Sequence, residues 1–74
     1  MMTWHYQLMH HKYDELGKEN DFYAIHEYYN LENNEKGWTE HPVIVQGDSP
    51  KEVKEILLMM VADLEEYGVK DYDG

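Results

Sequence analysis

Three stretches of the chain alternate apolar and polar side chains with a period of two, which is the spacing of a β-strand. The predicted strands span residues 3–13, 22–31 and 38–46. Residues 14–21 and 32–37 lie between them and contain Gly and Asn, which favour turns. Pro42 has no N–H to donate, so the third strand is expected to lie at a sheet edge or to begin its regular pairing after Pro42.

Residues 48–53, Asp-Ser-Pro-Lys-Glu-Val, have the pattern of a helix start. Ser49 is the expected N-cap, Pro50 is the first helical residue, and Glu52 follows the cap by three positions, which makes a capping box. Gly68 stands where a left-handed residue commonly ends a helix. The predicted helix therefore covers about residues 50–67. Its spacing places one apolar stripe toward the core, formed by Val53, Ile56, Leu57, Met60, Leu64 and Tyr67.

These elements predict an α+β fold in which a three-stranded antiparallel sheet is followed by one C-terminal helix packed on one face (β-β-β-α). We expect a single small acidic domain over residues 1–74, with residues 69–74 as a tail. In the second strand, Tyr29 and Tyr28 belong to opposite faces. A one-residue slip in register would exchange the faces, so the pattern does not decide which face the helix covers.

The face that the helix leaves open is a candidate binding surface, because Tyr, Trp and Met are enriched in protein interfaces. Tyr28 and Tyr29 are its candidate contact residues. Aromatic residues that merely fill a thin core are the equally weighted alternative. On the helix, Leu58, Met59 and Ala62 fall outside the apolar stripe. They are either ordinary exposed side chains or part of a contact patch.

The charge of the chain is strongly negative. Sixteen Asp and Glu residues stand against six Lys and no Arg, which gives a formal net charge of −10. Because binding to a phosphate backbone depends on Lys and Arg, direct binding to nucleic acid is disfavoured, and the expected partner is a basic protein. The acidic residues assigned to that partner lie on the helix and in the tail: Glu52, Glu55, Asp63, Glu65, Glu66, Asp71 and Asp73. The alternative is that they form a solvated face that only keeps the domain soluble.

No combination of residues points clearly to catalysis. His26 and Glu27 are adjacent, but consecutive residues of a strand point to opposite faces, so they do not form an acid/base pair. Ser49 is the only serine and is assigned to the helix cap, and the chain has no cysteine. The five histidines, among them His10 and His11, do not have the spacing of one metal site, although His26 and His41 could approach each other across strands. We therefore expect no enzyme, no cofactor and no bound metal.

The absence of an apolar run of about 20 residues predicts no membrane segment, and the first residues lack the pattern of a signal peptide. The expected compartment is the cytoplasm. With no cysteine, neither disulfides nor thiolate zinc sites can compensate for a small core. Packing must then supply the stability, with self-association or a partner adding further burial.

Residues 43–68, a strand that leads through Gly47, Asp48, Ser49 and Glu52 into a helix, resemble the corresponding segment of HicB-like antitoxins. The resemblance implies a partial RNase H-like sheet and helix that covers a basic RNA-cleaving toxin. HicB-like proteins usually carry a separate DNA-binding part as well, and residues 1–74 contain none, so autoregulation on DNA is not expected. Residues 3–7 and 23–29 also resemble small uncharacterised bacterial and phage proteins, a similarity that carries no function.

Two hypotheses follow. In the first, the chain is a non-catalytic acidic module that masks a basic, nucleic-acid-acting protein and imitates nucleic acid, as an antitoxin or a phage-encoded inhibitor of host defence would. In the second, it is a structural or assembly protein that forms a homodimer through an edge strand or through Leu58 and Met59. A metal-dependent enzyme is a third and weaker reading.

Overall fold

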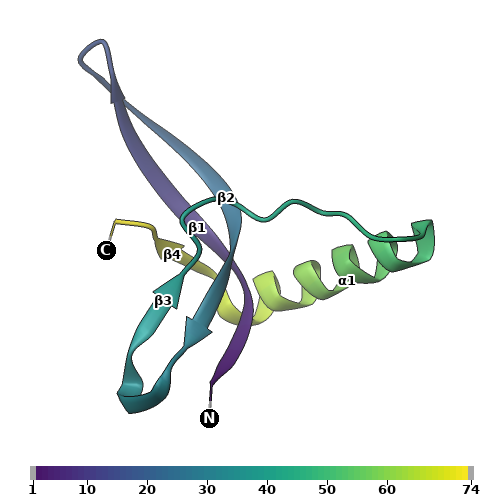
Figure 1. Cartoon of the computed structure of the whole chain (residues 1–74). Helices are drawn as coiled ribbons and strands as arrows, with labels where there is room; N and C mark the ends of the chain where they lie inside the picture. Colours follow the sequence, from purple (N-terminus) through teal and green to yellow (C-terminus); the bar gives the residue numbers. More distant parts are fainter. Residues whose placement is uncertain (1, 74) are drawn as a thin grey trace.

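In the computed structural model, which describes residues 2–73 except for the side chain of Glu15, one long hairpin forms the centre of the fold (Figure 1). Strands β1 (Thr3–Glu15) and β2 (Lys18–Asn30) are antiparallel and pair along their whole length, from Thr3 opposite Asn30 to Glu15 opposite Lys18. Leu16 and Gly17 connect them, and both have positive φ, 53° and 78°.

The predicted loop at residues 14–21 is therefore wrong, because most of it belongs to the two strands. A two-residue turn with φ above zero at both positions matches the right-handed twist of the flanking strands, so the hairpin needs no longer connection. Gly17 suits such a turn, whereas Leu16 adopts a backbone conformation that L-residues with a bulky side chain rarely take.

The third strand is short. After a 3-10 turn (η1, Glu32–Asn34), β3 (Lys36–Trp38) pairs antiparallel with β2 at the sheet edge. The edge position expected from Pro42 is confirmed, but the predicted extent of 38–46 is wrong, since regular pairing ends at Trp38. Beyond it, the Thr39 N–H and the Val43 N–H still donate to carbonyls of β2, at 3.0 and 2.8 Å.

The helix agrees with its prediction. Helix α1 (Pro50–Tyr67) begins after Ser49, whose side chain accepts a hydrogen bond from the Glu52 N–H at 3.1 Å. At the other end Gly68 has a φ of 66°, and its N–H donates to the Leu64 carbonyl at 3.1 Å. Both ends are thus satisfied by the residues that the sequence indicated.

A fourth strand replaces the predicted tail. Residues Val69–Asp71 form β4, which pairs in parallel with Leu8–His10 of β1, and the sheet has the order β3-β2-β1-β4. The predicted α+β class is confirmed. The sheet, however, has four strands and is mixed, whereas three antiparallel strands were predicted. Gly68 turns the chain out of the helix directly beside the open edge of β1, and that edge offers unpaired backbone groups.

The register decides which side chains share a face. His5, Gln7 and Met9 of β1 lie opposite Tyr28, His26 and Ala24 of β2. This face supplies most of the buried side chains of the described chain, namely His5, Gln7, Met9, His26 and Tyr28. Helix α1 adds Met60. Half of this small core is polar.

Helix α1 packs mainly against β1, along the edge that β4 continues (Figure 1). The Asp63 carboxylate accepts a hydrogen bond of 2.9 Å from the Tyr6 backbone N–H, which points away from β2. The Gln7 side-chain amide donates to the Gly68 carbonyl at 2.8 Å. The helix therefore packs along the β1 edge of the sheet, where Ile56 and Met60 line a pocket with Tyr6 and Glu27, and its N-terminal half extends beyond the hairpin.

Candidate protein-interaction surface

The outer side of α1 exposes several neighbouring apolar side chains. Val53, Ile56, Met60 and Leu64 face inward and are at least half-buried. On the outer side Leu58 is 60% exposed, Val61 55% and Met59 53%. The exposure expected for Leu58 and Met59 is confirmed, but Leu57, predicted to face the core, is 48% exposed.

Most of the exposed residues of α1 belong to two neighbouring strips at helical spacing. The first, called here the apolar strip, consists of Leu57, Leu58 and Val61, with Lys54 at one end and Glu65 at the other. The second, called here the acidic strip, consists of Glu52, Glu55, Met59 and Glu66. All of these side chains are exposed, so both strips are accessible to a partner.

The predicted acidic residues do not form one group. Glu55 and Glu66 belong to the acidic strip, Glu65 ends the apolar strip, and Asp73 is exposed near the C-terminus. Asp63 is half-buried and holds α1 to β1 through the Tyr6 N–H, so its role is structural.

Asp71 is likewise occupied within the chain. Its carboxylate lies 3.1 Å from Nδ1 of His10, and the Asp21 carboxylate lies 2.9 Å from Nε2 of the same ring. The hydrogen bond to Asp71, together with that to Asp21, raises the pKa of His10. Among the described side chains, His10 is the only cationic group found in an ion pair. The acidic groups of α1 are therefore not neutralised by the lysines of this part of the chain.

The two tyrosines predicted as contact residues are differently placed. Tyr28 is only 6% exposed, so its side chain offers a partner little surface. Tyr29 is half-buried on the opposite face, where its hydroxyl donates to Glu27 at 2.8 Å. This hydrogen bond raises the pKa of Tyr29. Strand alternation could not reveal that Trp38 and Lys70 would cover Tyr28.

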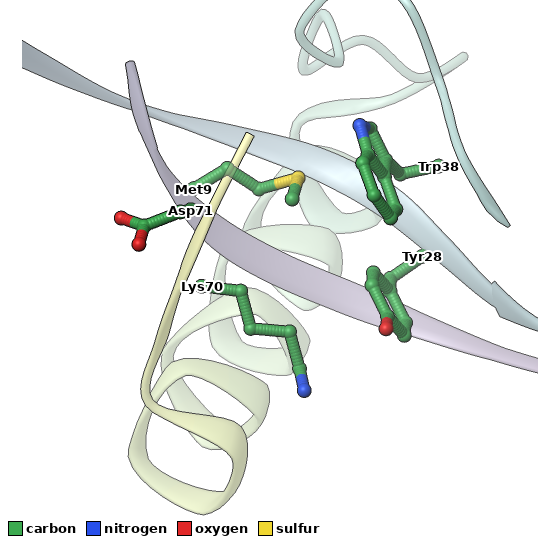
Figure 2. A pocket seen from close by; sticks show the side chains of 5 residues that line it. All are labelled: Met9, Tyr28, Trp38, Lys70 and Asp71. Carbon is green, nitrogen blue, oxygen red and sulfur yellow. The ribbon is translucent and has the colours of Figure 1, made fainter. Parts of the chain in front are cut away.

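A shallow pocket of about 290 Å³ lies beside Tyr28 (Figure 2). The rings of Tyr28 and Trp38 are nearly parallel, with centroids 5.7 Å apart, and the Lys70 ammonium group lies 5.1 Å from the Tyr28 centroid. Met9 lies beside the rings with its thioether end toward them, while the Asp71 carboxylate points away from them. The pocket thus combines the apolar surface of Met9, Tyr28 and Trp38 with one cation, Lys70, and one carboxylate, Asp71.

The histidines are held by neighbouring side chains. The His11 ring stacks between Phe22 and Tyr72, with centroids 4.4 and 4.3 Å away, and its Nε2 lies 2.8 Å from Nε2 of His26. The anticipated approach of His26 to His41 is thus replaced by a contact with His11. Among the described residues, no three His, Asp or Glu side chains are grouped so that they could hold a metal ion.

No helix within residues 2–73 has the length and apolar content needed to cross a membrane. Comparisons of the chain with protein-family models, with curated proteins and with solved structures gave no match.

Proposed function

We propose that the chain is a non-catalytic acidic module that binds and masks the basic surface of a nucleic-acid-acting protein. The observation that carries the proposal is the acidic strip, where Glu52, Glu55 and Glu66 are exposed and have no lysine ion pair among the described residues. Such charge remains available to an external cationic surface.

The physical argument combines charge with apolar contact. A net charge of −10 attracts a basic protein from a distance and speeds encounter, but charge at an exposed surface adds little lasting affinity. Met59 lies within the acidic strip and is 53% exposed, so a partner that reaches the strip also buries apolar surface. Carboxylates that flank an apolar contact are suited to a surface that otherwise binds phosphates.

The resemblance of residues 43–68 to HicB-like antitoxins supports the same reading, because it implies binding to a basic RNA-cleaving protein instead of chemistry. A sheet whose third strand is followed by a helix is compatible with that resemblance. Both an antitoxin and a phage-encoded inhibitor of host defence would use a compact acidic surface of this kind. The site of action that we propose is the cytoplasm.

The test compares matched charge variants in one capture experiment. The tagged chain is used to capture proteins from host-cell lysate, with washes at low and at high salt. Glu55→Gln with Glu66→Gln removes two charges from the acidic strip, and Glu19→Gln with Glu32→Gln removes two exposed charges elsewhere. A captured nuclease or other nucleic-acid-acting protein is then purified, and its activity on nucleic acid is measured with and without the chain.

We expect a basic protein that is retained by the wild type and by the Glu19/Glu32 variant, is lost from the acidic-strip variant, and is inhibited by the wild-type chain. Equal loss from both variants would mean that only net charge matters. Capture without inhibition would remove the masking role.

A further inference from the structure

The surface of the chain is too large for a monomer of its size. Its accessible area is 5849 Å², whereas the scaling of area with mass predicts about 4800 Å² for a folded chain of 8.9 kDa. The radius of gyration is 14.1 Å, compared with about 11 Å expected for 74 residues. The excess of about 1000 Å² is similar to the roughly 800 Å² that each partner buries in a stable interface of standard size.

The apolar strip contributes exposed apolar area that a second helix can bury. Leu57, Leu58 and Val61 are 48–60% exposed and adjacent on the same side of α1, which contributes only Met60 to the core. Neighbouring apolar side chains of this size on an outer helix face mark an interaction site. The strip faces away from the inward-facing residues of α1, and the N-terminal half of the helix extends beyond the hairpin, so a second helix has access to it (Figure 1).

The order of apolar and charged side chains along the apolar strip is complementary to itself, which favours a second copy of this chain as the partner. Lys54, Leu58, Val61 and Glu65 follow one another at intervals of four, three and four residues, the spacing of helix-to-helix contacts in left-handed bundles. This series is symmetric about a point between Met59 and Met60. Its two central members are apolar, and its two ends carry opposite charges.

We propose that a second copy of this chain covers the apolar strip by packing its own α1 antiparallel, with a two-fold axis between Leu58 and Val61. In this arrangement Leu58 contacts Val61 of the second copy, and Lys54 lies opposite Glu65 of the second copy, twice per dimer. A two-fold interface requires a self-complementary surface, and the series from Lys54 to Glu65 has that property. A parallel pair would instead place Lys54 against Lys54 and Glu65 against Glu65.

The interface is independent of the proposed masking role. The acidic strip lies on the neighbouring side of α1 and stays exposed in the dimer, which carries two such strips. Dimerisation is also expected to depend little on salt, because added ions screen the Lys54–Glu65 attraction and the repulsion between two chains of charge −10 alike. Salt should therefore release the basic partner and leave the dimer in place.

Sedimentation analysis of the purified chain tests the proposal, at concentrations up to about 100 μM, which suffices for a standard interface. We expect a dimer for the wild type and a monomer for Leu58→Lys, with far-UV circular dichroism confirming that the helix remains. Lys54→Glu alone and Glu65→Lys alone should each weaken the dimer by on the order of tenfold, since each creates two like-charge contacts.

The double variant Lys54→Glu with Glu65→Lys is decisive, because only antiparallel self-pairing restores both attractive contacts. We expect it to dimerise as the wild type does. The matched control, Lys18→Glu with Glu19→Lys, makes the same charge changes near the hairpin turn and should leave the dimer unaffected. A monomeric wild type, a dimeric Leu58→Lys variant, or a double variant that is no better than the single ones would overturn the proposal.

Discussion

The Nε2 atoms of His11 and His26 lie 2.8 Å apart, and the backbone next to them decides which ring donates the hydrogen bond. Nδ1 of His26 lies 2.8 Å from the Thr39 carbonyl, which can only accept, so Nδ1 carries a hydrogen. In neutral His26, Nε2 then accepts from the Nε2–H of His11.

The pKa of His10 should lie above the ordinary histidine value of 6.5 and that of His11 below it, although the two residues are neighbours in sequence. The hydrogen bonds to Asp71 and Asp21 raise the pKa of His10. Partial burial and then the nearby His26 lower the pKa of His11, against the opposing effect of Asp73. The pH titration of the histidine ring resonances by NMR measures both values.

The contributions of these two residues to the free energy of unfolding depend on pH in opposite directions. That of His10 is fully present below pH 6.5 and is lost as the pH rises through its raised pKa. That of His11 is present above pH 6.5 and is lost as the pH falls through its lowered pKa. Asp71→Asn should lower the midpoint of His10 and leave that of His11 in place; coinciding midpoints in the wild type would contradict the assignment.

Replacing Gln7 with Met should lower the free energy of unfolding by about 1–3 kcal/mol, because a buried hydrogen-bonding hub is lost. The Gln7 amide donates to the carbonyls of Leu8 and Gly68, and its oxygen accepts from Nε2 of His5 at 2.9 Å. Urea unfolding measures the change. Gln46→Met, at an exposed position, is the control and should stay within about 0.5 kcal/mol of the wild type. Equal effects would show that Gln7 is not a hub.

Replacing Leu16 with Asn should raise the free energy of unfolding by about 0.5–1 kcal/mol. Leu16 is 97% exposed and has a φ of 53°, so it makes little contact and carries backbone strain that Asn tolerates better. Gly17→Ala should act in the opposite direction, since a Cβ at a φ of 78° is strained although no atom lies near it. Thermal unfolding of both variants checks the turn, and a change of the same sign in the two would argue against it.

Removing the ring of Tyr72 should raise the pKa of His11 toward its ordinary value and speed amide exchange in β4. The Tyr72 ring stacks on His11, and its hydroxyl donates to the Glu40 carbonyl at 3.1 Å. Tyr72→Ala removes both contacts, while Tyr72→Phe keeps the ring and loses only the hydrogen bond. NMR titration and hydrogen exchange should place Tyr72→Phe close to the wild type; a shift as large as that of Tyr72→Ala would assign the effect to the hydroxyl.

The features predicted correctly are those that local residues determine. Ser49, Pro50 and Glu52 define the start of α1 within one turn of chain, and Gly68 defines its end. Strand β4 was not predicted, because three residues, Val69–Asp71, are too few to show a periodic pattern. Their pairing with β1 depends on where the C-terminal end of α1 lies. Local patterns do not include that information.

The contact between His11 and His26 was also beyond a sequence pattern. Phe22, Ala24 and His26 follow each other on one face of β2, and His11 lies opposite Phe22. The small side chain of Ala24 leaves room for the two imidazole rings to meet across it. This depends on a register that the sequence left undecided, so the alternative pair of His26 and His41 was equally compatible with the pattern.

The polar and ring contacts that fix α1 to β1 lie toward one end of the helix. Asp63, Tyr67 and Gly68 make them near the C-terminal end, while Pro50 is about 20 Å away along the axis. A tilt of ten degrees about Asp63 displaces Pro50 by about 3–4 Å. A substitution at Gln7, which belongs to neither strip, would thus change the direction in which both strips face.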